Sequence, residues 1–360
     1  MDSKLFYDLV QVAVGAKERL GRCPSKTEWD ELFSLSKKQS VVGIMLSGIE
    51  RLPEEQKPPQ TLLLQWIGMA EIVRKQNALL NRRCIEVTKL FADAGFRSCI
   101  LKGQGNAMMY PDASIRQPGD IDLWVDGNRK AIKEFVRSKC PKSQDGTLHI
   151  DFPYFKDVVV EVHYTPRYSN IPKYDKRLQE WFKNEAKVQF SNEVSLPGYP
   201  EDKACVPTTL FNAVHQMSHI MGHFFVEGIG LRQFIDYFYV LKRLHKEGCT
   251  VNFEELFDHL GMLKFARGVM WIEKEILGLE AGSLLLAPDE RIGRVILEEL
   301  EEGGNFGIHD ERYSARKHGY LMRGITDTYR LLKLTRYFPK ESLWKIVRKV
   351  ENQKWKVRDV

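Results

Sequence analysis

In the stretch Gly119-Asp120-Ile121-Asp122-Leu123-Trp124-Val125, acidic and apolar residues alternate before the turn signal Asp126-Gly127-Asn128. A period of two predicts a β-strand with one buried face. Asp120 and Asp122 then lie on the same face, about 6.6 Å apart along the strand. Two carboxylates held in this way can share hard divalent cations. The stretch therefore predicts a sheet and a candidate metal site on one of its strands.

Glu161 is expected to supply a third carboxylate. It stands within the apolar run from Val158 to Val162, where a charge is costly to bury unless it is paired or bound to metal. His163 would point to the same face of this second strand as Glu161. We expect it either to support the metal ligands or to make a structural hydrogen bond. The alternative for all three carboxylates is a solvated surface.

A turn at Lys102-Gly103 precedes the acidic strand. It ends the short apolar run at 98–101 and leads into a short helix expected at 105–110. A glycine turn before a helix exposes backbone N–H groups that suit phosphate, and Lys102 adds a positive charge. Arg116 is expected either to contact phosphate oxygens or to stabilise its own turn.

The period of the apolar residues changes along the chain, and this change divides it into segments. Ser25 and Glu28 form a capping-box signal for one N-terminal helix, and residues 61–94 suit one long helix. The predicted fold class is α+β, with a small mixed sheet flanked by N-terminal and C-terminal helical segments. The expected segments are helical 1–95, α/β core 96–165, irregular connection 166–205, helical 206–310, and basic and aromatic-rich 311–360.

Three histidines on a predicted helix form a competing site. His215, His219 and His223 recur every fourth residue, which places the imidazoles on one helix face, and imidazole is a common ligand of transition metals. The glutamate that the zinc-protease signature requires after the first histidine is missing. The face could instead line the active-site cleft. Asp236, in an aromatic helix, is expected to act as a general base for the acceptor or to pair with Arg232.

Composition and charge exclude several classes. The chain has 360 residues, 43% hydrophobic and 28% charged, which argues against disorder and against a collagen-like protein. No apolar run approaches the length of a membrane span, and the start lacks the pattern of a signal peptide. The six cysteines are scattered singly, as expected of reduced thiols in a cytoplasmic protein.

The basic balance belongs to the C-terminal end. Residues 311–360 contain 14 basic and five acidic residues, a net +9 against +6 for the whole chain, so the first 310 residues carry −3. Aromatic residues are interspersed among these cations. We expect this segment first to pack on the protein, second to contact a membrane or a partner protein, and third to bind nucleic acid.

These motifs together resemble a known family. Leu101-Lys102-Gly103, Tyr110-Pro111, Arg116, Gly119-Asp120-Ile121-Asp122-Leu123 and Glu161-Val162-His163 are similar to the uncharacterised bacterial nucleotidyltransferases of the polymerase-β-type superfamily. The resemblance is specific over about residues 97–164 and looser over the flanking helices. The wider superfamily usually has Gly-Ser at the turn, whereas Gln104 follows Gly103 here.

The resemblance implies the function. Asp120, Asp122 and Glu161 would bind two Mg²⁺ ions, or Mn²⁺, and the turn at Lys102 and Gly103 would hold the triphosphate of an NTP such as ATP. One ion would activate an acceptor hydroxyl and the other would neutralise the departing pyrophosphate. The acceptor could be a small molecule, a protein or RNA. Two alternatives stay open, which are a non-catalytic scaffold with this fold that binds a partner protein, and a metallohydrolase built on the histidine helix.

Overall fold

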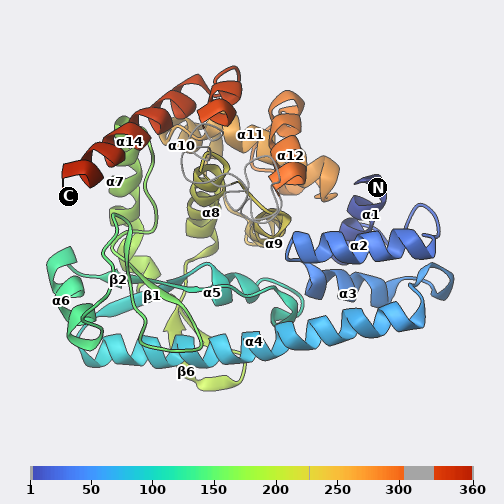
Figure 1. Ribbon diagram of the computed structural model, residues 1–360, viewed down its shortest axis with the longest axis horizontal. Helices are drawn as coiled ribbons and strands as arrows, with labels where there is room; N and C mark the ends of the chain where they lie inside the picture. The colour runs from blue at the N-terminus through green and yellow to red at the C-terminus, as the bar shows by residue number, and fades with distance from the viewer. Residues whose placement is uncertain (1–2, 227, 304–327, 359–360) are drawn as a thin grey trace.

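The structure is a computed structural model that describes residues 3–226, 228–303 and 328–358, with side chains of the last stretch described as far as residue 348. A six-stranded mixed sheet and the helices around it form the described part of the chain (Figure 1). The predicted α+β class is confirmed. Within the described residues, no helix combines the length and the hydropathy that a bilayer span requires.

The sheet has the strand order β3-β4-β2-β1-β6-β5. β2 runs antiparallel to β1 and parallel to β4, and this register places Asp122 between Leu101 on β1 and Glu161 on β4. Two predicted features of the site, the acidic strand and the glutamate strand, are therefore direct neighbours. The strands are β1 (Arg97–Leu101), β2 (Ile121–Asp126), β3 (His149–Asp151), β4 (Val160–His163), β5 (Glu193–Leu196) and β6 (Tyr199–Cys205).

The long helix α4 (Gln60–Asp93) covers one face of the sheet and extends beyond it to the N-terminal helices (Figure 1). Its buried Val87 and Phe91 pack in one cluster with Leu123 of β2. The predicted helix at 61–94 and the capping box at Ser25 are confirmed. Helix α6 (Arg129–Lys139) packs on the same face. At the other end of α4, beyond the sheet, lie α1 (Ser3–Ala13), α2 (Lys26–Lys38), α3 (Val42–Arg51) and η1 (Glu54–Gln56) (Figure 1).

Helices of the C-terminal half cover part of the opposite face. Trp124 of β2 lies 4.5 Å from Phe190 and 5.7 Å from Phe211, between ring centroids, so the far end of this face is apolar. The acidic end of the same face stays uncovered. The helices next to this face are α7 (Pro172–Gln189) and α8 (Thr209–Phe224). The remaining helices of this half are α9 (Leu231–Lys246), α10 (Phe253–His259), α11 (Leu263–Trp271), η3 (Ile272–Ile276), η4 (Ala281–Ser283) and α12 (Glu290–Gly303).

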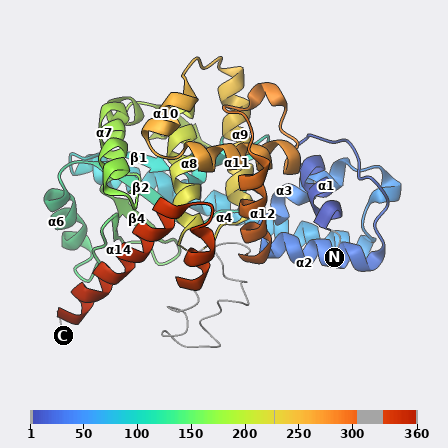
Figure 2. The ribbon, with the colours of Figure 1, turned by 90° about the horizontal axis from the view of Figure 1, so that it is seen from above.

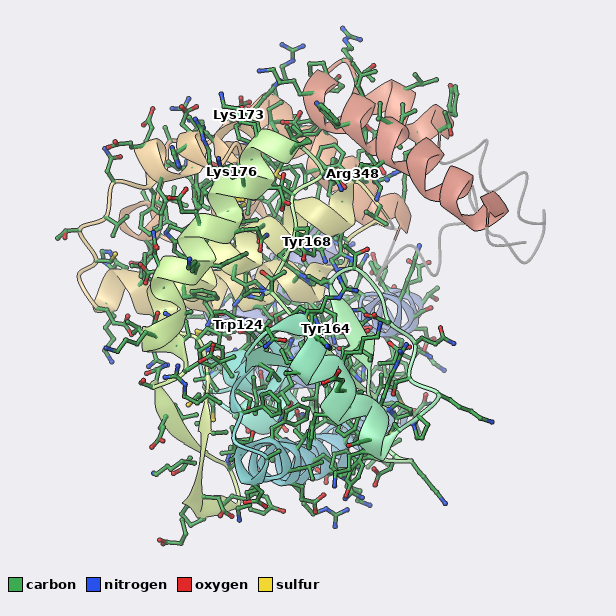
Figure 3. The ribbon with its side chains drawn as sticks, turned by 90° about the vertical axis from the view of Figure 1, so that its left-hand side faces the viewer. Trp124, Tyr164, Tyr168, Lys173, Lys176 and Arg348 are labelled. Carbon is green, nitrogen blue, oxygen red and sulfur yellow. The ribbon has the colours of Figure 1, made fainter. Side chains whose placement is uncertain are left out.

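The expectation of an irregular connection at 166–205 is wrong. After β4 the chain rises from Tyr164 past Tyr168 to α7, as Figure 3 shows. Pro172 begins α7, whose Leu178 and Phe182 are buried, and β5 and β6 follow as a hairpin that joins the sheet beside β1. The segment looks irregular in the sequence because α7 buries few side chains, Leu178, Phe182 and Gln189, and because the other prolines lie outside this helix.

Other expectations differ from the structure at their boundaries. Within the segment expected to be helical, 206–310, α10 and α11 are separated at Gly261, which adopts a φ of +73°. Much of the basic segment, residues 311–327, lies outside the described residues. Its last helix, α14 (Pro339–Arg358), crosses the outside of the molecule near α7 (Figure 2), where Arg348 Nε donates to the carbonyl oxygen of Asn170 at 3.2 Å.

Candidate active site

Three carboxylates converge where β2 and β4 lie side by side. One carboxylate oxygen from each of Asp120, Asp122 and Glu161 lies within 4.8 Å of the others. Asp120 is exposed, Glu161 is half-buried, and Asp122 is only 3% exposed. The structure thus brings together the three residues that the sequence singles out as metal ligands. Oxygen ligands at this spacing suit Mg²⁺ or Mn²⁺.

The two aspartates differ in charge environment. The nearby negative charge of Asp122 is the main cause that raises the pKa of Asp120. Burial also works against the ionised form of Asp122, but Lys102 and His163 outweigh it and hold the pKa of Asp122 well below its usual range. Lys102 Nζ lies 2.9 Å from Asp122 Oδ2, and His163 Nε2 lies 2.9 Å from Asp122 Oδ1. A bound cation would relieve the repulsion between the carboxylates.

The turn at Lys102 and Gly103 joins β1 to the short helix α5 (Gly103–Ala107). Lys102 has a φ of +50° and Gly103 a φ of +47°, which is the left-handed region that a non-glycine residue rarely adopts. This backbone directs the Lys102 side chain to Asp122 at the cavity wall. In this structure the amine therefore pairs with a carboxylate.

Arg116 and Asp236 form a buried ion pair. Arg116 donates to both carboxylate oxygens of Asp236, at 2.7 and 2.8 Å, and Tyr110 and Asn106 donate to the same carboxylate at 2.7 and 3.3 Å. Burial opposes ionisation of Asp236, yet Arg116 holds its pKa below the usual value. A permanently paired carboxylate of this kind is a poor general base. Arg116 is equally committed, so the structure favours its structural role over phosphate contact.

The expected partner of Asp236 within its own helix, Arg232, has another role. Arg232 Nη1 donates to the carbonyl oxygens of Gln117 and Pro118, at 3.1 and 3.4 Å. These bonds fix the loop that leads into Asp120. Arg116 and Asp236 are 120 positions apart in the sequence, so no local pattern predicts their ion pair. Arg232 was the expected partner because it lies four positions before Asp236 on the same helix.

Two histidines on neighbouring strands stand beside Glu161. His163 Nε2 lies 3.4 Å from Glu161 Oε2, and His149 Nδ1 lies 3.1 Å from the same oxygen. Burial lowers the pKa of His163, but its contacts with Asp122 and Glu161 raise it by more. The sequence alone does not identify His149 as a residue of the site. It could be recognised only from the pairing of β3 with β4, which places His149 opposite His163.

The histidines of α8 do not form a metal site of their own. His215 is fully buried among aromatic rings, and burial lowers its pKa to about 3. Burial also lowers the pKa of His223, to about 2, and that of His219, so all three are neutral near pH 7. In the described part of the chain, groups of three or more potential ligands occur at two places, and both include Glu161. The metallohydrolase alternative therefore has no support.

A cavity of about 920 Å³ opens over the carboxylates. His219 and His223 line the opposite wall, together with Arg167 from the segment after β4. The space above Gly222 of α8 is filled by Arg167, because a Cβ added there would lie 2.3 Å from its Nη2. The cavity thus combines an acidic floor with cationic and neutral polar walls.

A mixed sheet that presents converging carboxylates to a cavity with cationic walls is suited to metal-assisted chemistry on phosphates. A family model described as "Uncharacterised nucleotidyltransferase" matches residues 25–278. The chain belongs to this family and is a nucleotidyltransferase. Comparisons with curated proteins and with solved structures give no match. The family match extends over α2 to α4 and over α8 and α9, well beyond the α/β core.

Proposed function

We propose that this protein transfers a nucleoside monophosphate from an NTP to a hydroxyl-bearing acceptor, with Asp120, Asp122 and Glu161 as ligands of two Mg²⁺ or Mn²⁺ ions. The observation that carries the proposal is the convergence of these three carboxylates at the cavity floor. When bound, the ions supply a charge that activates the acceptor hydroxyl and stabilises the departing pyrophosphate.

The protein's own groups prepare this floor. Asp122 stays ionised although it is buried, because Lys102 and His163 flank its two oxygens. Asp120 faces the solvent side of the site and would share both ions with Asp122. Glu161, which extends from the neighbouring strand, would hold the acceptor-side ion. Lys102, at the cavity wall, is positioned to exchange its carboxylate partner for a phosphate of the NTP.

The volume of the cavity bears on the acceptor. Ligand pockets for small molecules span roughly 300–1,000 Å³, so about 920 Å³ suits a nucleotide together with a small acceptor or the end of a larger one. Small molecule, protein and RNA therefore remain acceptor classes to be tested. A cytoplasmic location and a protein or acidic-surface contact through the basic C-terminal segment are further predictions.

The test is binding and transfer with purified protein. Each labelled NTP is incubated with Mg²⁺ and a cell extract, and the labelled product is identified. Asp122→Asn should lower transfer about 100-fold or more, because the metal sites supply several kcal/mol of charge stabilisation. Asp126→Asn is the matched control, since Asp126 ends the same strand, pairs with Arg97 and does not line the cavity.

The same experiment also distinguishes the transferase from the non-catalytic scaffold. Loss of Mg²⁺-dependent NTP binding in Asp122→Asn, with normal folding and normal binding in Asp126→Asn, supports the transferase. A variant that binds NTP as wild type does would refute the proposed site. A folded wild-type protein that binds no NTP but retains a specific protein partner would favour the non-catalytic scaffold.

A further inference from the structure

A cluster of mixed ligands adjoins the three carboxylates. The register of β3 and β4 pairs His149 with His163, and Glu161 lies two positions before His163 on the same strand face. His149 Nδ1 and His163 Nε2 lie 3.1 and 3.4 Å from Glu161 Oε2. One ligand atom from each of the three residues lies within 4.8 Å of the others.

These separations match the ligand shell of a metal ion. Nitrogen and oxygen ligands of a tetrahedral ion lie about 2.0–2.1 Å from the metal, so they lie about 3.4 Å from each other. Both separations between the carboxylate and the imidazoles are close to this value. Imidazole nitrogens suit Zn²⁺ and other transition metals, and Co²⁺ and Mn²⁺ also accept mixed nitrogen and oxygen ligands, whereas Mg²⁺ prefers oxygen ligands alone.

The ring nitrogens give a second, independent indication. Nδ1 of His149 and Nδ1 of His163 are buried and have no hydrogen-bond partner among the described residues, whereas Nε2 of His163 lies 2.9 Å from Asp122 Oδ1 without ideal hydrogen-bond geometry. His163 as a whole is only 3% exposed. Buried polar atoms normally find partners, and each exception needs an explanation. A metal ion beside Glu161 would provide the partner that His149 Nδ1 lacks and would also bind His163 Nε2.

The surroundings also fit a metal-binding histidine. Such a residue usually directs its other ring nitrogen to a carboxylate, which fixes the orientation of the ring. His149 Nε2 lies 3.5 Å from Asp151 Oδ1, two positions along β3. Lys102 pairs with Asp122 Oδ2, whereas His163 contacts the other oxygen of that carboxylate. The amine therefore does not occupy the space between the imidazoles and Glu161.

We propose that His149, Glu161 and His163 bind one divalent cation of the Mn²⁺, Co²⁺ or Zn²⁺ type, next to the Asp120–Asp122 pair. Glu161 has two carboxylate oxygens and links this ion to the oxygen-ligated one. The site itself is independent of the proposed transfer reaction. If that reaction holds, the acceptor-side ion is ligated by nitrogen as well as by oxygen.

The first experiment uses Mn²⁺ alone with the full chain. Pulsed electron paramagnetic resonance of bound Mn²⁺ should show ¹⁴N couplings from imidazole in the wild-type protein, and His149→Ala together with His163→Ala should remove them. His245→Ala is the control, because His245 is exposed on α9, and its couplings should equal those of wild type. Bound Mn²⁺ without ¹⁴N coupling in the wild-type protein overturns the proposal, and this result does not depend on any variant's folding.

The second experiment measures Co²⁺ affinity by calorimetry. Loss of a carboxylate that orients a ligand typically weakens metal binding 10–100-fold, so Asp151→Asn should weaken Co²⁺ binding by about tenfold and His149→Gln by more. Equal affinity in His149→Gln and wild type overturns the proposal. Mg²⁺-dependent NTP binding in the same variant separates the two proposals: retained NTP binding with lost Co²⁺ binding supports both. A wild-type protein with nitrogen-ligated Mn²⁺ and no NTP binding supports this site and refutes the transferase.

Discussion

Asp236→Asn tests whether the buried ion pair holds the sheet core to the helices above it. The Asp236 carboxylate accepts two bonds from Arg116, and the two side chains are 6% and 4% exposed. Asparagine keeps the shape but leaves the guanidinium charge buried without its counter-charge. Removal of one partner of such a pair costs about 3–5 kcal/mol, so we expect this loss in the free energy of unfolding. Urea titration followed by tryptophan fluorescence measures it.

Two further variants make the test specific. Glu290→Gln breaks a pair with Arg294 of similar length, 2.7 Å, between side chains that are 61% and 67% exposed. Such a surface pair contributes about 0–1 kcal/mol, so the control should change little. Arg116→Met combined with Asp236→Asn leaves no buried charge and should cost less than the sum of the single variants. A loss in Asp236→Asn within about 1 kcal/mol of the control, or simple additivity, would refute the reasoning.

Three other predictions address separate regions. Burial lowers the pKa of His215 from 6.5 to about 3 in the folded state, so in acid the unfolded chain binds more protons than the folded one. This difference should lower the free energy of unfolding by about 2 kcal/mol from pH 7 to pH 5, and His215→Leu should remove that part of the pH dependence in urea titrations. Gly43→Ala would place a Cβ 2.2 Å from the carbonyl oxygen of Ile115 and should lower the free energy of unfolding by about 1–3 kcal/mol. Gly68→Ala, in open space on α4, should raise the free energy of unfolding by up to about 1 kcal/mol in the same titration. Lys102→Met should tighten binding of Mn²⁺ alone and weaken binding of NTP with Mg²⁺, both by calorimetry, and weaker Mn²⁺ binding would contradict the assigned charge balance.

Local patterns predicted much of the fold because they act over a few residues. The alternation before Val125, the capping box at Ser25 and the uninterrupted period of α4 are each sufficient to specify an element. The segment that became α7, β5 and β6 was missed because its helix has one narrow buried face. β6 also joins the sheet by a parallel pairing with β1, about a hundred residues earlier, and no local pattern specifies such a contact.

In the candidate site too, local patterns predict some residues, and the others depend on contacts between distant parts of the chain. Asp120 and Asp122 share a strand, and Glu161 stands out as a charge in an apolar run, so local patterns predict all three. His149 and the Arg116–Asp236 pair depend on which strands and helices become neighbours. Arg167 is likewise recognised as a cavity residue only once its segment has been placed against Gly222 of α8.

Lys102 connects the charge balance of the site to the order in which ligands bind. Without a bound cation, its amine neutralises the buried Asp122 carboxylate, which would otherwise be costly to keep ionised. A divalent ion bound at Asp122 would take over that neutralisation and repel the Lys102 amine. The positive charge of the released Lys102 amine would then be stabilised best if a triphosphate were bound beside it. Under the proposed function, cation and NTP therefore bind cooperatively, because each provides the partner that the other displaces or releases.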